Sequence, residues 1–293
     1  MIKYFKKAFQ ITNENIILTT PLVLFLFLLS LYLGLAKSAP TNIQSTILLL
    51  FTILFMVSAF FAGWFFMVKK AVELDKNDFI IDEDRSKASF NLIKEIPCGI
   101  GEYFLPFIGA VILYSILVLL LAFATYEVGI HFIGSVGITL EQLRIGMEST
   151  AAMKSLISSI SHEELLRLNS WNILLLIVTA FYSFITMFWA VQIVMKTKNP
   201  ILALFQSVGV IFKNPLASII LFVYISFINF TVSLINTLST IHPILYFISM
   251  LIYFYFLVYV VVLIFLYYDR EISEIDEQTE DNSDSGSDSD GEE

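Results

Sequence analysis

The sequence predicts an all-α polytopic membrane protein with six transmembrane helices. Of its 293 residues, 57% are hydrophobic and only 15% are charged, whereas soluble domains contain about 45–50% apolar and about 25% charged residues. Apolar runs of about 20 residues, the length that crosses the roughly 30 Å hydrocarbon core of a bilayer, recur six times along the chain. This composition excludes a water-soluble globular domain.

Each span is expected to be helical, because backbone amides in the hydrocarbon core have no water to bond. The first span could instead be a signal peptide, since Lys3, Lys6 and Lys7 precede it. Its apolar run is longer than the roughly 7–15 residues of a signal-peptide core, so we interpret it as a retained span. The six predicted spans are residues 16–36, 46–68, 104–126, 171–195, 215–238 and 244–268.

The basic residues predict the orientation of the spans. Of the 17 Lys and Arg residues, 13 lie in the N-terminus, the segments 69–103 and 196–214, and the C-terminal tail, and four lie in the segments on the other side. Loops rich in Lys and Arg stay in the cytoplasm. Both termini are therefore predicted to be cytoplasmic, which agrees with the even number of spans.

A similar short pattern precedes each odd-numbered span. The three copies are Ala8-Phe9-Gln10, Ala88-Ser89-Phe90-Asn91 and Ala203-Leu204-Phe205-Gln206. In the first, Ile2, Phe5 and Phe9 share one helical face while the lysines lie elsewhere, which is typical of an amphipathic helix in the membrane interface. The pattern predicts three pseudo-repeated units, each an amphipathic helix followed by a transmembrane hairpin.

Together with six spans, these motifs resemble a known family. The Ala-x-Phe pattern is joined by Lys213-Asn214-Pro215 and by a closing Tyr267-Tyr268-Asp269-Arg270. In these features the chain resembles the YciC-like membrane proteins, and it is similar to the membrane domain of some glycerophosphodiester phosphodiesterases. The resemblance covers about residues 1–270. It implies a multi-pass protein of the prokaryotic plasma membrane and supplies no catalytic residues.

Polar side chains recur at helical spacing in two spans. On the fourth span they are Thr179, Ser183 and Thr186, and on the fifth they are Ser226, Asn229, Ser233 and Asn236. One interpretation is helix packing, because small and hydroxyl residues allow close approach and Asn bonds across helices. Ala59 and Gly63 form a small-xxx-small pair with the same interpretation. The alternative is a polar path between the fourth and fifth spans.

Residues 127–170 predict an outer loop that carries two short amphipathic helices. One helical face is formed by Leu140, Leu143 and Met147, and another by Met153, Leu156, Ile157 and Ile160. The loop also contains two capping boxes, each a Ser or Thr followed three residues later by Glu or Gln, a pattern that opens helices. The first box is Thr139 with Gln142, and the second is Ser161 with Glu164.

No metal site, cofactor or reaction centre is predicted. The segment His162-Glu163-Glu164 lacks the second His of the H-E-x-x-H zinc motif. The single cysteine, Cys98, excludes an intramolecular disulfide and a Cys-based cluster. The sequence contains no nucleophile elbow or Gly-rich phosphate loop. An enzymatic function is therefore not expected.

Residues 271–293 are predicted to be a disordered cytoplasmic tail. The segment 269–293 contains 12 acidic residues and one Arg, and such a segment buries too little apolar surface to offset the entropy of ordering. An anionic membrane surface repels this tail. It would either meet a basic protein partner or only increase solubility.

The leading functional interpretation is a non-enzymatic protein of membrane organisation or assembly. Such a protein would contact the lipid bilayer and protein partners through its bundle, its outer helices and its acidic tail, with no nucleic-acid partner. The sequence leaves oligomerisation open. The alternative is a permease or lipid-handling component that uses the polar faces of the fourth and fifth spans. Because the spans carry no ionisable residue at their centres, proton- or ion-coupled transport is disfavoured.

Overall fold

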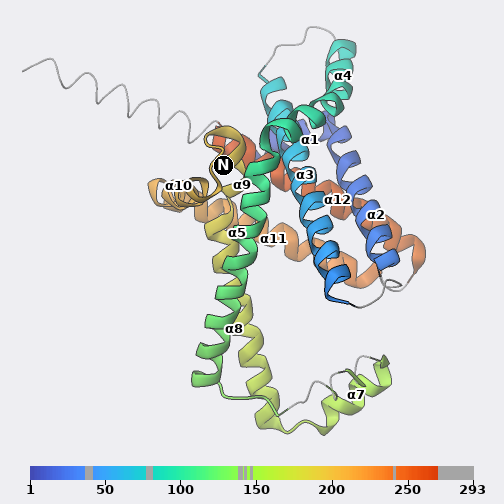
Figure 1. The fold of residues 1–293 in the computed structure, drawn as a ribbon, viewed down its shortest axis with the longest axis vertical. Helices are drawn as coiled ribbons and strands as arrows, with labels where there is room; N and C mark the ends of the chain where they lie inside the picture. The colour runs from blue at the N-terminus through green and yellow to red at the C-terminus, as the bar shows by residue number, and fades with distance from the viewer. Residues whose placement is uncertain are drawn as a thin grey trace, which may run out of the picture. The chain divides into compact units, whose positions relative to one another are not determined.

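The computed structural model of the protein is almost entirely helical and describes residues 1–36, 42–76, 82–137, 141, 144–145, 148–239 and 242–269. None of these residues lies in a β-strand (Figure 1). Within the described residues, six helical segments are long and apolar enough to cross a membrane, which confirms the predicted all-α, multi-pass fold class. They are Ile16–Ala36, Ile43–Leu74, Glu83–Phe132, His162–Met195, Pro215–Ile235 and Ile244–Tyr267. The predicted tail of residues 271–293 lies outside the described part of the chain.

The chain divides into two compact units. Unit 1 comprises Met1–Leu113 and Ile185–Glu293, and unit 2 comprises Tyr114–Phe184. Two long helices, α5 (Glu95–Phe132) and α8 (His162–Thr186), run through both units. The remaining elements of unit 1 are α1 (Ile2–Glu14), η1 (Ile16–Leu18), α2 (Thr19–Ala36), α3 (Ile43–Leu74), α4 (Asp82–Asn91), η2 (Leu92–Lys94), α9 (Trp189–Met195), α10 (Pro200–Lys213), α11 (Pro215–Ser239) and α12 (Pro243–Tyr267), and unit 2 adds α7 (Thr150–Ser159).

Helix α12 is the central helix of unit 1, because it contacts α1, α2, α3 and α11. Its buried side chains include Phe254, Val258, Tyr259, Val262, Leu263 and Leu266. The buried face of α11 consists of aliphatic side chains at helical spacing, namely Leu221, Ile225, Ile228 and Val232. The two helices therefore pack mainly through hydrocarbon in close van der Waals contact, and a hydrogen bond between the hydroxyls of Tyr224 and Tyr259, at 3.0 Å, also joins them.

Helix α1 confirms the predicted amphipathic helix, but the protein itself covers much of its apolar face. Ala8 and Ile11 are fully buried. The ring of Phe5 stacks on the ring of Tyr224 in α11, with the centroids 3.8 Å apart. Ile2, by contrast, is 72% exposed, and Phe9 is 51% exposed although its ring also meets Tyr255 and Tyr259 of α12 edge to face. One side of the apolar face of α1 therefore packs against α11 and α12, and the other side is exposed.

A short 3-10 turn joins each of two helices, α1 and α4, to the span that follows it. Turn η1 connects α1 to α2, and turn η2 connects α4 to α5. The indole N–H of Trp64 in α3 donates to the carbonyl of Leu18, at 2.9 Å, and so holds the end of η1.

The Phe of each predicted repeat motif is exposed, by 51% at Phe9, 66% at Phe90 and 70% at Phe205. The three-unit repeat nevertheless stays a prediction.

Helices α3 and α5 approach closely at two glycines of unit 1. A Cβ on Gly99 would lie 2.6 Å from the Cβ of Phe66 and 2.8 Å from the carbonyl oxygen of Ala62. A Cβ on Gly63 would lie 2.7 Å from the Cγ2 of Ile96. Gly63 therefore serves helix packing, as its small-xxx-small motif predicted.

In unit 2, the second half of α5 runs beside α8. The ring of Trp171 lies against Gly129, and its indole N–H donates to the carbonyl of Gly134 at 3.0 Å. The hydroxyl of Tyr182 donates to the carbonyl of Tyr114 at 3.5 Å. These contacts join the helices on both sides of the predicted outer loop.

The structure revises the predicted outer loop. The backbone N–H of Glu164 donates to the Oγ of Ser161, at 3.2 Å, so Ser161 caps a helix as the motif predicted. It opens α8 itself, because the helix continues without interruption into the fourth span, and no separate short helix forms there. The other capping box, Thr139 with Gln142, lies outside the described residues. Helix α7 is a short helix in the predicted outer loop, and it includes Met153, Leu156 and Ile157 of the second predicted helical face.

The predicted fourth span is divided between two helices. Helix α8 ends at Thr186, and α9 begins at Trp189. The hydroxyl of Ser207 in α10 donates to the carbonyl of Ile185 at 3.0 Å, and the indole N–H of Trp189 donates to the carbonyl of Pro200 at 2.8 Å. Side-chain and backbone groups from α10 thus satisfy polar groups around the break.

We expect Gly99→Ala to destabilise the protein, because the added methyl group would overlap Phe66 and the backbone of Ala62. Overpacking of this kind costs about 1–3 kcal/mol. Gly101→Ala is the matched control on the same helix, since nothing lies within 4 Å of its Cβ position. Thermal or chemical unfolding in detergent checks the pair. Equal stability of the two variants would contradict the close crossing.

Candidate functional site

The polar residues predicted on the fifth span lie on the surface of α11. Ser226, Asn229 and Ser233 are all exposed, and we call these three residues the polar stripe of α11. They lie outside the buried aliphatic face by which α11 packs on α12. The side chain of Asn236 lies outside the described residues.

The polar residues predicted on the fourth span are also largely uncovered. Thr179 and Ser183 of α8 are exposed, and Thr186, the last residue of that helix, is half-buried. No residue of α8 is buried in the described part of the chain. The polar path between the fourth and fifth spans stays a prediction.

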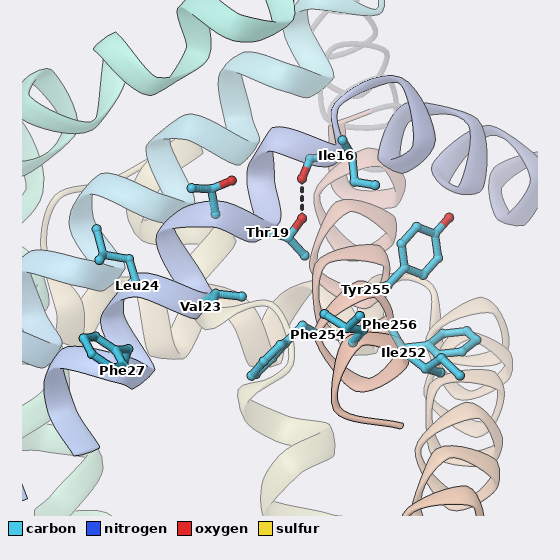
Figure 2. Close-up of a pocket in the computed structure, with 11 residues that line it drawn as sticks. Ile16, Thr19, Val23, Leu24, Phe27, Ile252, Phe254, Tyr255 and Phe256 are labelled. Atoms are coloured by element: carbon cyan, nitrogen blue, oxygen red, sulfur yellow. Dashed lines mark hydrogen bonds between the residues drawn. The ribbon is translucent and has the colours of Figure 1, made fainter. Parts of the chain in front are cut away.

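An apolar groove between α2 and α12 is the candidate site of unit 1. Its volume is about 920 Å³, which lies within the roughly 300–1,000 Å³ of small-molecule sites. Figure 2 shows the side chains that line it, on the two helices. From η1 and α2 they are Ile16, Thr19, Thr20, Val23, Leu24 and Phe27, and from α12 they are Leu251, Ile252, Phe254, Tyr255 and Phe256.

The groove is apolar along its length, and several of the side chains that form its walls are exposed. Val23, Leu24 and Phe27 are 39%, 56% and 62% exposed. Phe254 is only 4% exposed and belongs to the packed side of α12. The stretch from Ile16 to Phe27 extends for about 16 Å along the helix axis, at roughly 1.5 Å per residue. The walls can therefore contact an extended hydrocarbon chain over several turns of helix.

Polar groups gather at the end of the groove that adjoins α1. The hydroxyl of Tyr255 donates to the Oδ1 of Asn13, at 2.7 Å. The hydroxyl of Thr19 donates to the carbonyl of Ile16 (Figure 2), and Thr20 is exposed beside it. The groove thus changes from hydrocarbon to hydroxyl and amide groups at one end.

A cluster of ion pairs holds α1 at this end of the groove. Asp75, at the end of α3, has a side chain that is only 2% exposed, and it pairs with Lys7 at 2.8 Å and with Arg85 at 3.6 Å. Arg85 of α4 also pairs with Glu14 of α1. A buried carboxylate needs such partners, because burial of an isolated charge is costly.

The chemistry of the groove is that of a binding surface. Its polar atoms are neutral hydroxyl and amide groups, which can donate to or accept from ester and phosphate oxygens. Within the described residues, no group of three or more His, Cys, Asp and Glu side chains could hold a metal ion. The sequence showed Thr19 and Thr20 as a polar pair at the start of a span. It contained no signal that Tyr255, near the other end of the chain, would join them.

Comparison with known proteins does not add to this assignment. No family model, curated protein or solved structure matches the chain. The resemblance to the YciC-like membrane proteins stays a prediction that rests on the residues that carry it.

We expect Asp75→Asn to lower the free energy of unfolding by about 1–3 kcal/mol, because Lys7 and Arg85 would then face each other without a carboxylate. The full penalty of a buried pair is not expected, since the side chains of Lys7 and Arg85 are 29% and 30% exposed. Unfolding in detergent measures the effect.

Glu83→Gln is the control for this substitution. It breaks the ion pair between Glu83 and Lys87, whose side chains are 74% and 65% exposed, and exposed pairs contribute less than about 1 kcal/mol. Adding Lys7→Met to Asp75→Asn should restore part of the lost stability. If the losses of stability in Asp75→Asn and in Lys7→Met simply add in the double variant, the two charges are not coupled.

Proposed function

We propose that the protein is a non-enzymatic, multi-pass membrane protein that acts in membrane organisation or assembly by contacting neighbours within the bilayer. The observation that carries the proposal is the apolar hairpin of unit 2, formed by α5 and α8. Helix α8 buries none of its residues, so its apolar surface is available to lipid and to other proteins.

The exposed surface of this hairpin extends around its helices. Leu119 and Leu120 are 70% and 61% exposed, and Leu176 and Ile177 are 71% and 58% exposed. Consecutive residues of a helix point in directions about 100° apart, so each helix presents apolar side chains on more than one side. Helices in membranes associate through such surfaces by van der Waals contact.

We further propose that both termini face the cytoplasm and that the membrane is the plasma membrane. Contacts within unit 1 support the first part, because they join segments that the distribution of basic residues assigns to the same side. Lys76 pairs with Asp269 at 2.7 Å. The ammonium group of Lys69 donates to the carbonyl of Val194 at 3.2 Å.

A second candidate function is that of a permease or lipid-handling component. The exposed polar stripe of α11 favours it, since Asn229 lies near the middle of a membrane-spanning helix and is not covered. Polar side chains in the hydrocarbon region usually face a partner helix or a water-filled path. The proposed path would involve the fourth and fifth spans.

The leading proposal predicts that photo-crosslinkers on the hairpin capture neighbouring proteins in native membranes. Benzoylphenylalanine at Leu119 and at Leu176 should give discrete adducts, because both positions lie on the exposed apolar surface of the unit 2 hairpin that the proposal assigns to partners. The control position is Leu31 of α2, which is 51% exposed. Adducts are identified by mass spectrometry and confirmed by reciprocal crosslinking from the captured protein. Identical, lipid-only adducts at all three positions would contradict the proposal.

Reconstitution separates the two candidate functions. In proteoliposomes that contain a fluorescent phospholipid, the leading proposal predicts no translocation that depends on the protein. The alternative predicts translocation that is lost when Asn229 and Asn236 are both replaced by Leu. Phe230→Leu is the control, since Phe230 is 62% exposed on the same helix. Translocation that survives the double substitution would refute the polar path.

A further inference from the structure

We infer that the groove between α2 and α12 binds one acyl chain of an anionic phospholipid, with the phosphate on the exposed face of α1 that carries Lys6. This inference goes beyond the proposed function, which names no lipid. It rests on three properties of unit 1: an apolar groove inside the spans, a polar end to that groove, and uncompensated positive charge beyond that end.

The first property is the position of the groove. Its walls belong to the spans Ile16–Ala36 and Ile244–Tyr267, so hydrocarbon rather than water surrounds it in a membrane. Val23, Leu24 and Phe27 leave it open along one side. An acyl chain can therefore enter sideways from the bilayer and lie along the helices, where it gains contact with several side chains at once.

The second property distinguishes a lipid from a partner helix. A transmembrane helix satisfies its own backbone hydrogen bonds and needs no polar group at one end of a groove. A phospholipid carries ester and phosphate oxygens at the end of its chains. Tyr255, Asn13 and Thr20 place hydroxyl and amide groups at the matching end of the groove.

The third property is the charge on α1. Lys3, Lys6, Gln10 and Asn13 are spaced by three, four and three residues and are all exposed, so they share one face of the helix. Lys6 lies about 10 Å along the helix axis from Asn13, on the side away from the groove, at roughly 1.5 Å per residue.

The acidic groups around this face are already paired with other cations. Asp75 pairs with Lys7, and Glu14 pairs with Arg85. None of the described acidic residues forms an ion pair with Lys3 or Lys6. The face of α1 therefore presents net positive charge next to the polar end of the groove, and this charge complements a phosphate.

The test uses the purified full-length protein and native mass spectrometry in detergent. Phosphatidylglycerol and phosphatidylcholine with identical oleoyl chains are added separately and in competition. We expect saturable retention of one lipid per chain. Phosphatidylglycerol should be preferred by about fivefold, the effect expected for one lysine near a membrane surface.

One pair of variants tests the groove. Val23→Trp places a bulky ring in the path of the acyl chain and should abolish retention of both lipids. Val118→Trp is the matched control, because Val118 of α5 is 38% exposed and Val23 is 39% exposed. Should Val23→Trp not yield folded protein, Leu24→Ser removes apolar contact at a position that is 56% exposed. It should weaken retention of both lipids.

Another pair of variants tests the charge. Lys6→Glu should abolish the preference for phosphatidylglycerol while retention of phosphatidylcholine persists. Lys154→Glu makes the same change of charge at an exposed position of α7 and should leave the preference intact.

Three results would overturn the inference. One is equal retention of lipid by Val23→Trp and Val118→Trp. Another is equal retention of the two lipids by the unmodified protein. The third is a lipid-free dimer that dissociates in Val23→Trp, which would identify a second copy of the chain as the occupant of the groove.

Discussion

The packing of α1 along α12 determines where unit 1 is apolar and where it is polar. The ring of Tyr4 packs edge to face on that of Tyr267, and the hydroxyl of Tyr255 donates to Asn13, so the first and last described helices lie side by side. This contact brings the start of α2 beside α12 and thereby forms the groove. It also leaves Lys3 and Lys6 on the outer face of α1. The buried carboxylate of Asp75 secures the arrangement, because it neutralises Lys7 on α1 and Arg85 on α4 at the same place.

The two units differ in how much of their apolar surface is covered by packing within the unit. In unit 1, a glycine crossing between α3 and α5 and an aliphatic seam between α11 and α12 turn apolar helices toward each other. In unit 2, Trp171 against Gly129 joins the hairpin, while most of its apolar surface stays uncovered. Since lipid tails are as apolar as leucine, exposed leucines in a membrane carry no penalty, and helices associate only where their shapes fit. The proposals of a contact surface on the hairpin and of a lipid site in the groove both follow from surface that internal packing does not use.

Prediction from the sequence succeeded where the physics is local. Six apolar stretches became six helical segments, and Ser161 capped a helix as its capping box indicated. Prediction from the sequence was less accurate at the ends and breaks of helices. Helix α5 continues to Phe132, and the fourth span is interrupted before Trp189. The second difference has a tertiary cause, because Ser207 of α10 supplies the hydrogen bond at Ile185.

The sequence by itself determined that the chain spans a membrane as helices. A long uncharged helix satisfies the hydrogen bonds of its own backbone N–H and C=O groups in hydrocarbon. Only the tertiary structure decided which faces meet. Helix α11 carries apolar side chains both on its buried face and on its exposed surface, so the polar stripe alone did not indicate which apolar side packs on α12. The groove likewise depends on residues from opposite ends of the chain, and their proximity arises from packing that no local pattern records.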